Sequence, residues 1–157
     1  MIRAIGQNDV LEAILLMKNS MLQHNYQNLG EYNEKAWISY FCSLVDKQEK
    51  KDPNALVIGY YDNSLKGFLS AATFNSYYND VVIMDVKDCI VDKQNKQNNP
   101  RIIYALFNYM IEHTKKHGGK YWRADSVQEY DDALRYAKFL KKRFKGNIQV
   151  SVRGCIE

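Results

Sequence analysis

Residues 98–103 have the composition of a helix start that could bind an anion. They read NNPRII, in which Asn99 and Pro100 are a favoured N-cap and first helical residue. The first N–H groups of a helix lack partners within it and lie at the positive end of its dipole, so a phosphate can bind there. Pro100 removes one of these donors, whereas Arg101 adds a guanidinium that suits phosphate. The segment therefore predicts a helix N-terminus with anion-binding capacity but without glycine.

Histidine and cysteine are the remaining residues that commonly bind metals. His113 and His117 have a chelating i, i+4 spacing, but they fall near a helix C-terminus, whose negative dipole end favours them, and no third ligand is near in sequence. Cys42, Cys89 and Cys155 form no C-x-x-C pair. We therefore expect neither a metal site nor a disulfide framework, and a reducing compartment. In a strand, Cys89 is more typical of a small buried hydrophobe than of a reactive thiol.

Length and composition favour one globular domain over residues 1–157. Hydrophobic residues make up 46% and charged residues 25%, which excludes a disordered or membrane class. The apolar runs are too short to cross a bilayer and residues 1–5 do not resemble a signal peptide, so we expect a cytoplasmic protein. The net charge is only +4, its basic excess falls in residues 47–51 and 138–145, and no recognition motif accompanies it. A role in nucleic-acid binding is therefore not expected.

Apolar periodicity and turn residues predict the order β-α-α-β-β-β-α-β-α-β. The expected strands are residues 2–5, 55–61, 65–74, 81–91, 120–125 and 147–156. Helices are expected after Asp9, from about Glu34, at Pro100 and after Ser126, the first and last with the spacing of a capping box. This order implies a mixed, mostly antiparallel sheet with helices on both faces.

The order of elements resembles that of the GNAT family of acyl-CoA-dependent N-acyltransferases over the whole chain. Four segments look like the family's third strand, the end of its fourth strand, the start of its cofactor helix and the exit from that helix: KGFLSA (66–71), DCIVD (88–92), YALF (104–107) and EHTKKHGG (112–119). In length and in its opening helix pattern, the chain is most similar to the short GNAT-like proteins that tailed phages encode. The resemblance implies the GNAT fold.

The resemblance also implies a site for acetyl-CoA. In the family, the fourth strand parts from the fifth and binds the pantetheine arm, while the next helix start and a loop with the signature Q/R-x-x-G-x-G/A bind the pyrophosphate. The corresponding cofactor-binding residues would be Cys89, Ile90, Val91, Lys96, Asn98, Asn99, Arg101, Ile102 and Ile103. Both glycine positions of the signature are filled, by Arg101 and Ile103. The β-branched Ile103 would stand where the diphosphate approaches the backbone.

Catalytic candidates follow from the same resemblance. Asp85 and Asp88 lie on the fourth strand, where the family often has a carboxylate base. Because they are three residues apart, we expect them to face opposite sides of the sheet, and Asp88 is the base candidate. Tyr136 lies where the family has a general-acid tyrosine. The family's Y-x-x-x-G-F lacks its glycine here, however, and a packing or surface role for Tyr136 is favoured over that of an acid. Ser126 could hydrogen-bond the substrate or the cofactor, but a helix-capping role is sufficient to explain it and is favoured.

Two functions are compatible with these patterns. The first is an N-acetyltransferase that transfers an acetyl group from acetyl-CoA to an unidentified amine, with residues 24–32 facing the acceptor. The second is a catalytically inactive GNAT-fold scaffold or interaction protein, such as a phage virion component, acting in the host cytoplasm or the virion. The filled glycine positions favour the second, as does a C-terminal segment long enough for one strand only. A second copy or a protein partner could complete that sheet edge.

Overall fold

The computed structural model describes residues 1–21, 33–75, 81–92, 94, 98–125, 130–144 and 147. Contacts divide the chain into two compact units, Met1–Asp125 and Ser126–Glu157. The first contains a sheet with three helices, and the described part of the second is the helix α4 (Tyr130–Phe144). No helix within the described ranges is long and apolar enough to span a membrane.

The sheet has five strands in the order β1-β2-β3-β4-β5. Their bounds are Ile2–Ala4, Ala55–Asp62, Ser64–Asn75, Val82–Val91 and Tyr121–Ala124. Neighbouring strands are antiparallel from β1 to β4, whereas β5 runs parallel to β4. The predicted mixed, mostly antiparallel sheet is thus confirmed. Of the strand expected over residues 147–156, only Asn147 is described, and the structure assigns it to no strand; residues 148–156 and the capping box at Ser126 lie outside the described part of the chain.

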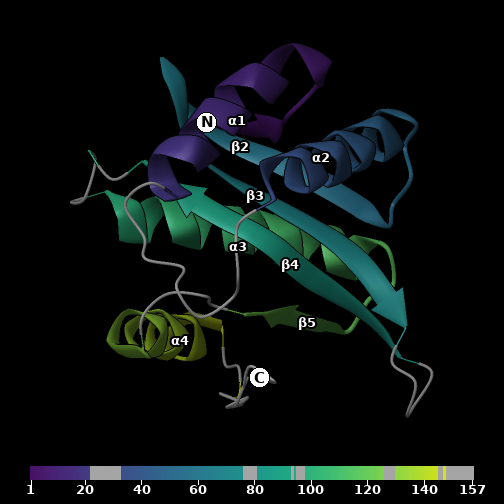
Figure 1. Ribbon diagram of the computed structural model, residues 1–157. Helices are drawn as coiled ribbons and strands as arrows, with labels where there is room; N and C mark the ends of the chain where they lie inside the picture. Colours follow the sequence, from purple (N-terminus) through teal and green to yellow (C-terminus); the bar gives the residue numbers. More distant parts are fainter. Residues whose placement is uncertain are drawn as a thin grey trace, which may run out of the picture. The chain divides into compact units, whose positions relative to one another are not determined.

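Helices cover both faces of this sheet, as predicted. Helices α1 (Val10–Met21) and α2 (Glu34–Glu49) lie on one face and α3 (Asn99–Lys116) lies on the other (Figure 1). Alternate residues of each strand therefore enter different cores. A buried hydrophobic cluster on the α1/α2 face consists of Ile5, Ala13, Met17, Phe41, Leu44, Val45, Ala55, Val57, Leu65 and Phe68.

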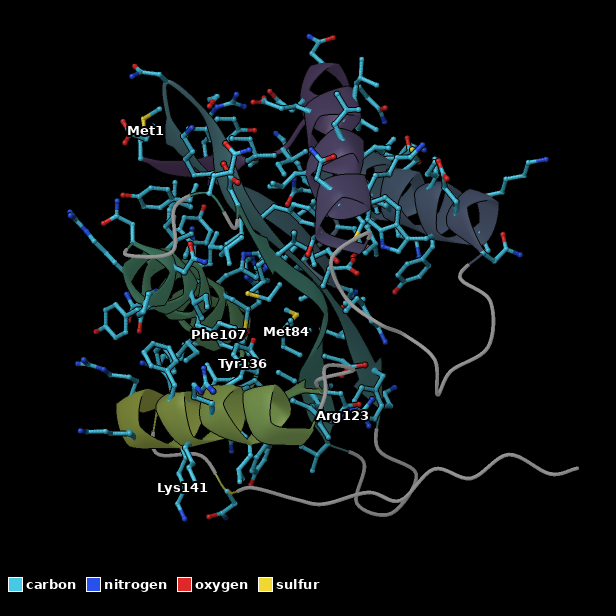
Figure 2. The ribbon with its side chains drawn as sticks, turned by 60° about the vertical axis from the view of Figure 1, so that its left-hand side comes forward. Met1, Met84, Phe107, Arg123, Tyr136 and Lys141 are labelled. Atoms are coloured by element: carbon cyan, nitrogen blue, oxygen red, sulfur yellow. The ribbon has the colours of Figure 1, made fainter. Side chains whose placement is uncertain are left out.

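The other core lies between the sheet and α3. Ile102, Leu106, Phe107 and Met110 are all buried, and their spacing places them along one face of the helix. Phe107 meets Trp122 of β5 edge to face, with ring centroids 5.6 Å apart. Met84 of β4 is buried on the same side of the sheet (Figure 2). The helix ends before Gly118, whose φ of +78° permits the expected left-handed exit.

Two helix starts differ from the sequence predictions. The carboxylate of Asp9 accepts hydrogen bonds from the Gly6 N–H and from Arg3, while Glu12 accepts one from the Leu65 N–H of β3 at 2.7 Å. The predicted capping box between Asp9 and Glu12 is therefore wrong, because both side chains bind partners outside α1. The N-cap of α3 is Asn98, one residue before the predicted Asn99, and its side chain makes no capping hydrogen bond.

Gly67 allows the first turn of α3 to approach β3 and β4. A Cβ at this position would lie 2.9 Å from Ile102 Cγ2 and 2.9 Å from the Ile90 carbonyl oxygen. Moving the Ile90 backbone to relieve this contact costs more than moving the end of a flexible side chain. We therefore expect Gly67→Ala to destabilise the fold by about 1–3 kcal/mol. Urea denaturation would measure this. Gly6→Ala is the matched control, because its Cβ would meet only the side-chain ends of Glu49 and Asp9, and equal losses in both variants would contradict the prediction.

Candidate active site

A β-bulge in β4 places two carboxylates on one face of the sheet. Ser70 of β3 pairs with Asp88, and the adjacent Ala71 pairs with Val86, so Lys87 is an extra residue in β4. Ala72 pairs with Asp85. Because cross-strand partners share a face, Asp85 and Asp88 both point to the α1/α2 side. The expectation that they face opposite sides is wrong, because the extra residue Lys87 shifts the alternation of side chains by one and brings both carboxylates to the same face.

Asp88 is held at the sheet surface by two hydrogen bonds from different elements. The indole N–H of Trp37 in α2 donates to Oδ1 at 3.1 Å, and the hydroxyl of Ser70 donates to Oδ2 at 2.5 Å. Burial raises the pKa of Asp88 above its ordinary value, although both hydrogen bonds and the charge of Lys87 act in the opposite direction. A carboxylate with a raised pKa is a stronger base, so Asp88 has the chemistry of a proton acceptor.

Asp85 has a different environment. It is only 4% exposed. Arg123 of β5 donates to both of its carboxylate oxygens, through Nε and Nη2, at 2.9 Å each, and Lys87 donates to Oδ2 at 2.5 Å. Burial alone would raise its pKa, but the hydrogen bonds and charges of Arg123 and Lys87 outweigh burial and hold the pKa below its ordinary value. Asp85 is therefore a fixed anion and Asp88 is the better base.

The pairing between β4 and β5 is short. It runs from Ile83 and Tyr121 to Val86 and Ala124, whereas β4 continues to Val91. The Asp92 N–H donates to the Lys66 carbonyl of β3, so Lys66 and Asp92 form a hydrogen-bonded pair between β3 and β4. Since bonded and non-bonded pairs alternate in antiparallel strands, the backbone N–H and C=O groups of Cys89 and Val91 point away from β3. They face the side on which β5 pairs with the earlier residues of β4, Ile83 to Val86.

The start of α3 retains features of an anion site. Its first internal hydrogen bond runs from the Ile102 N–H to the Asn98 carbonyl, so the N–H of Arg101 precedes the helical ladder. The Arg101 side chain is exposed. Ile102 is buried against Gly67, whereas Ile103, which the sequence placed against the phosphates, is half-buried. Lys96 lies outside the described residues.

The proposed acid belongs to the second unit. Tyr136 lies on α4 and its side chain is half-buried. The acceptor segment at residues 24–32 and Ser126 lie outside the described residues. Asp88, Cys89, Ile90 and Val91 are thus brought together on β4, with the start of α3 next to that strand through Gly67.

The two histidines have local partners. His113 Nε2 donates to the Pro53 carbonyl at 3.2 Å, and the His117 ring contacts the His113 carbonyl at 2.9 Å. Burial lowers the pKa of His113. Among the described residues no three potential ligands gather around a common point. Cys89 is half-buried on the α3 side of β4.

Sequence reasoning missed four residues that set the electrostatics of this site: Ser70, Trp37, Lys87 and Arg123. Trp37 and Asp88 are 51 positions apart, and Arg123 is 38 positions from Asp85. Their pairing depends on the register of the folded sheet, so no local pattern indicates it. The one available signal was Ser70, a small polar residue within the otherwise apolar stretch of residues 67–72, because a buried hydroxyl needs a hydrogen-bond partner.

Comparisons with known proteins support the fold at low sequence identity. No protein-family model matches the chain, and no curated protein matches it in sequence. An aminoglycoside acetyltransferase from an uncultured soil metagenomic sample superposes with a TM-score of 0.66 at 16% identity, over 100% of this chain and 95% of that one. The ribosomal-protein-alanine N-acetyltransferase of Brucella melitensis gives 0.65 at 14%, over 100% and 98%. An aminoglycoside 6′-N-acetyltransferase of Acinetobacter haemolyticus gives 0.68 at 11%, also over 100% and 98%.

These similarities extend over nearly the whole length of both chains in each case. The chain therefore has the fold of GNAT acetyltransferases, as its order of elements predicted. At such identities the likeness concerns the fold alone.

Proposed function

We propose that this protein is an N-acetyltransferase of the GNAT family that transfers an acetyl group from acetyl-CoA to an amine. The observation that carries the proposal is Asp88, a carboxylate of raised pKa held by Trp37 and Ser70, next to strand backbone that points away from β3 at Cys89 and Val91. The candidate base and the backbone proposed to hold the thioester-bearing arm thus lie on one segment.

The residues present fit acetyl-CoA. The backbone of Cys89 and Val91 would hold the pantetheine arm, and the Arg101 N–H and guanidinium would hold the pyrophosphate at the positive end of α3. Asn98, Asn99 and Ile102 form the rest of that helix start, and Lys96 would add a cation. Acetyl-CoA supplies an activated thioester whose acyl carbon an amine can attack.

Asp88 would prepare the amine. An ammonium ion cannot act as a nucleophile, so the base must first remove its proton, and the raised pKa of Asp88 favours this transfer. Trp37 and Ser70 would fix the carboxylate during the transfer. Tyr136 would protonate the leaving thiolate. This role assumes that the unit containing α4 belongs to the same functional domain, residues 1–157.

A catalytically inactive scaffold of the same fold is the second candidate. One observation favours it: Pro100, Arg101 and Ile103 occupy a helix start at which the family's glycines let phosphates approach the backbone. Such a scaffold would serve as a phage virion component or bind a second copy or a protein partner, and it would bind no acetyl-CoA.

A thermal-shift titration separates the two candidates. A ligand that binds only the folded state stabilises it, by about 2.7 kcal/mol at 100 times its Kd. We expect acetyl-CoA to raise the melting temperature and Arg101→Met to weaken that effect, with Lys115→Met as the matched control for loss of an exposed charge. No shift at millimolar acetyl-CoA would leave only the scaffold.

A further inference from the structure

Two cations share the single buried carboxylate beside the proposed base. Oδ1 of Asp85 accepts from Arg123 Nε, and Oδ2 accepts from both Arg123 Nη2 and Lys87 Nζ. A carboxylate carries one negative charge, so the triad of Asp85, Lys87 and Arg123 has an excess of one positive charge. This excess is held in place rather than spread over mobile side chains.

The triad is rigid and accessible. The guanidinium of Arg123 lies over the Phe74 ring at 4.6 Å, which fixes its plane, and its side chain is 48% exposed. The side chain of Lys87 is 36% exposed. Arg123 Nη1 and two protons of Lys87 Nζ have no hydrogen-bond partner among the described residues, so donors remain for an incoming anion.

The triad lies next to Asp88 on the same face of the sheet. Lys87 precedes Asp88 directly, and its charge acts on Asp88 and on the Tyr40 hydroxyl of α2. Two further described carboxylates lie near the triad: Asp88 itself, and Asp125, which is exposed at the end of β5 and acts on Arg123. The surface is therefore bipolar, with a proton acceptor on one side of the bulge and anion-binding donors on the other.

We propose that Lys87 and Arg123 form an anion subsite, and that the acceptor is an amine with a carboxylate close to it, as in an amino acid. The amine would lie at Asp88, and the carboxylate at those donors of Lys87 and Arg123 that have no partner in the described part of the chain, where charge-assisted hydrogen bonds are strong. A purely cationic polyamine meets repulsion from the same donors. This inference rests on the proposed function, because it assigns the acceptor of that site.

The test compares ligands that differ only in the carboxylate. L-lysine against cadaverine and L-tyrosine against tyramine are titrated calorimetrically, with and without coenzyme A, which has no acetyl group to transfer. We expect the carboxylated member of each pair to bind at least about tenfold more tightly. Lys87→Met is expected to reduce that ratio, whereas the matched control Lys50→Met, which removes an exposed lysine paired with Asp46, is expected to keep it.

The outcomes separate this inference from the proposed function. Equal or tighter binding of cadaverine and tyramine overturns the anion subsite, as does a failure of all four ligands to bind. If the carboxylated ligands bind more tightly but coenzyme A does not bind, the anion subsite is supported and the acetyltransferase function is rejected. A ratio unchanged by Lys87→Met would also reject the assignment of the subsite.

Discussion

Asp88→Asn is expected to lower kcat for acetyl transfer by about 10²–10⁴, the usual contribution of a positioned general base. The amide can still accept from Trp37 through its oxygen, so the geometry at α2 is retained while the proton acceptor is lost. Release of coenzyme A thiol in the presence of an amine measures the rate. Binding of acetyl-CoA should persist, because the Asp88 side chain is not among the groups proposed to hold the cofactor.

Asp46→Asn is the matched control, since this aspartate is exposed on α2 and pairs only with Lys50 among the described residues. Its kcat should equal that of the wild type. Full activity of Asp88→Asn would remove Asp88 from the mechanism.

The pH dependence of kcat/KM should follow the state of Asp88. The base acts only when deprotonated, so kcat/KM falls as pH drops through its pKa, which burial raises. The Ser70 hydroxyl favours the carboxylate, so Ser70→Ala should move this acidic limb to higher pH. A limb that does not move would mean that another group titrates.

The same raised pKa predicts a stability effect. A carboxyl whose folded-state pKa exceeds the unfolded value stabilises the fold below the unfolded pKa, and this contribution is lost as pH rises through the folded pKa. Asp88→Asn cannot ionise, so the unfolding free energy of the variant minus that of the wild type should be larger at pH 8 than at pH 3. Urea denaturation at both pH values measures the difference, and an equal difference contradicts the buried environment of Asp88.

Arg123→Met is expected to destabilise the fold by about 2–3 kcal/mol. Asp85 is 4% exposed, and removal of a partner from a buried charge commonly costs about 3–5 kcal/mol. The smaller value is expected because half of the Arg123 side chain is exposed and Lys87 remains with Asp85. Urea denaturation at neutral pH measures the loss.

Asp85→Asn combined with Arg123→Met provides the matched control. The amide of Asn carries no charge, so the double variant should lose less stability than Arg123→Met alone. If both variants unfold at the same urea concentration as the wild type, the ion pair between Arg123 and Asp85 does not contribute to stability.

The fold was largely predictable because its signals are local. The turn at residues 62–64, the apolar spacing of α3 and the Gly118 exit each depend on residues close in sequence. Even so, the sequence could not distinguish which of two adjacent isoleucines is buried. Periodicity tolerates a shift of one residue at a helix end, and the contact with Gly67 selects Ile102.

The site was less predictable because it depends on register. The bulge at Lys87 contains neither glycine nor proline, so nothing local indicates it, and simple alternation then puts Asp85 on the wrong face. The resemblance to acetyltransferases selected Asp88, but the burial that raises its pKa and the hydrogen bonds from Trp37 and Ser70 that hold it depend on other elements. The two hydrogen bonds from Arg123 to Asp85 likewise require the parallel pairing of β5 with β4.

The central claim is that the end of β4 and the start of α3 hold one acyl-CoA molecule. Titration of ¹⁵N-labelled protein with acetyl-CoA, followed by NMR, tests it residue by residue. The amide signals of Val91 and Arg101 should shift together and saturate at one concentration, while that of Arg3 on β1 stays in place. Signals at Val91 and Arg101 that remain unmoved at millimolar acetyl-CoA would contradict the claim.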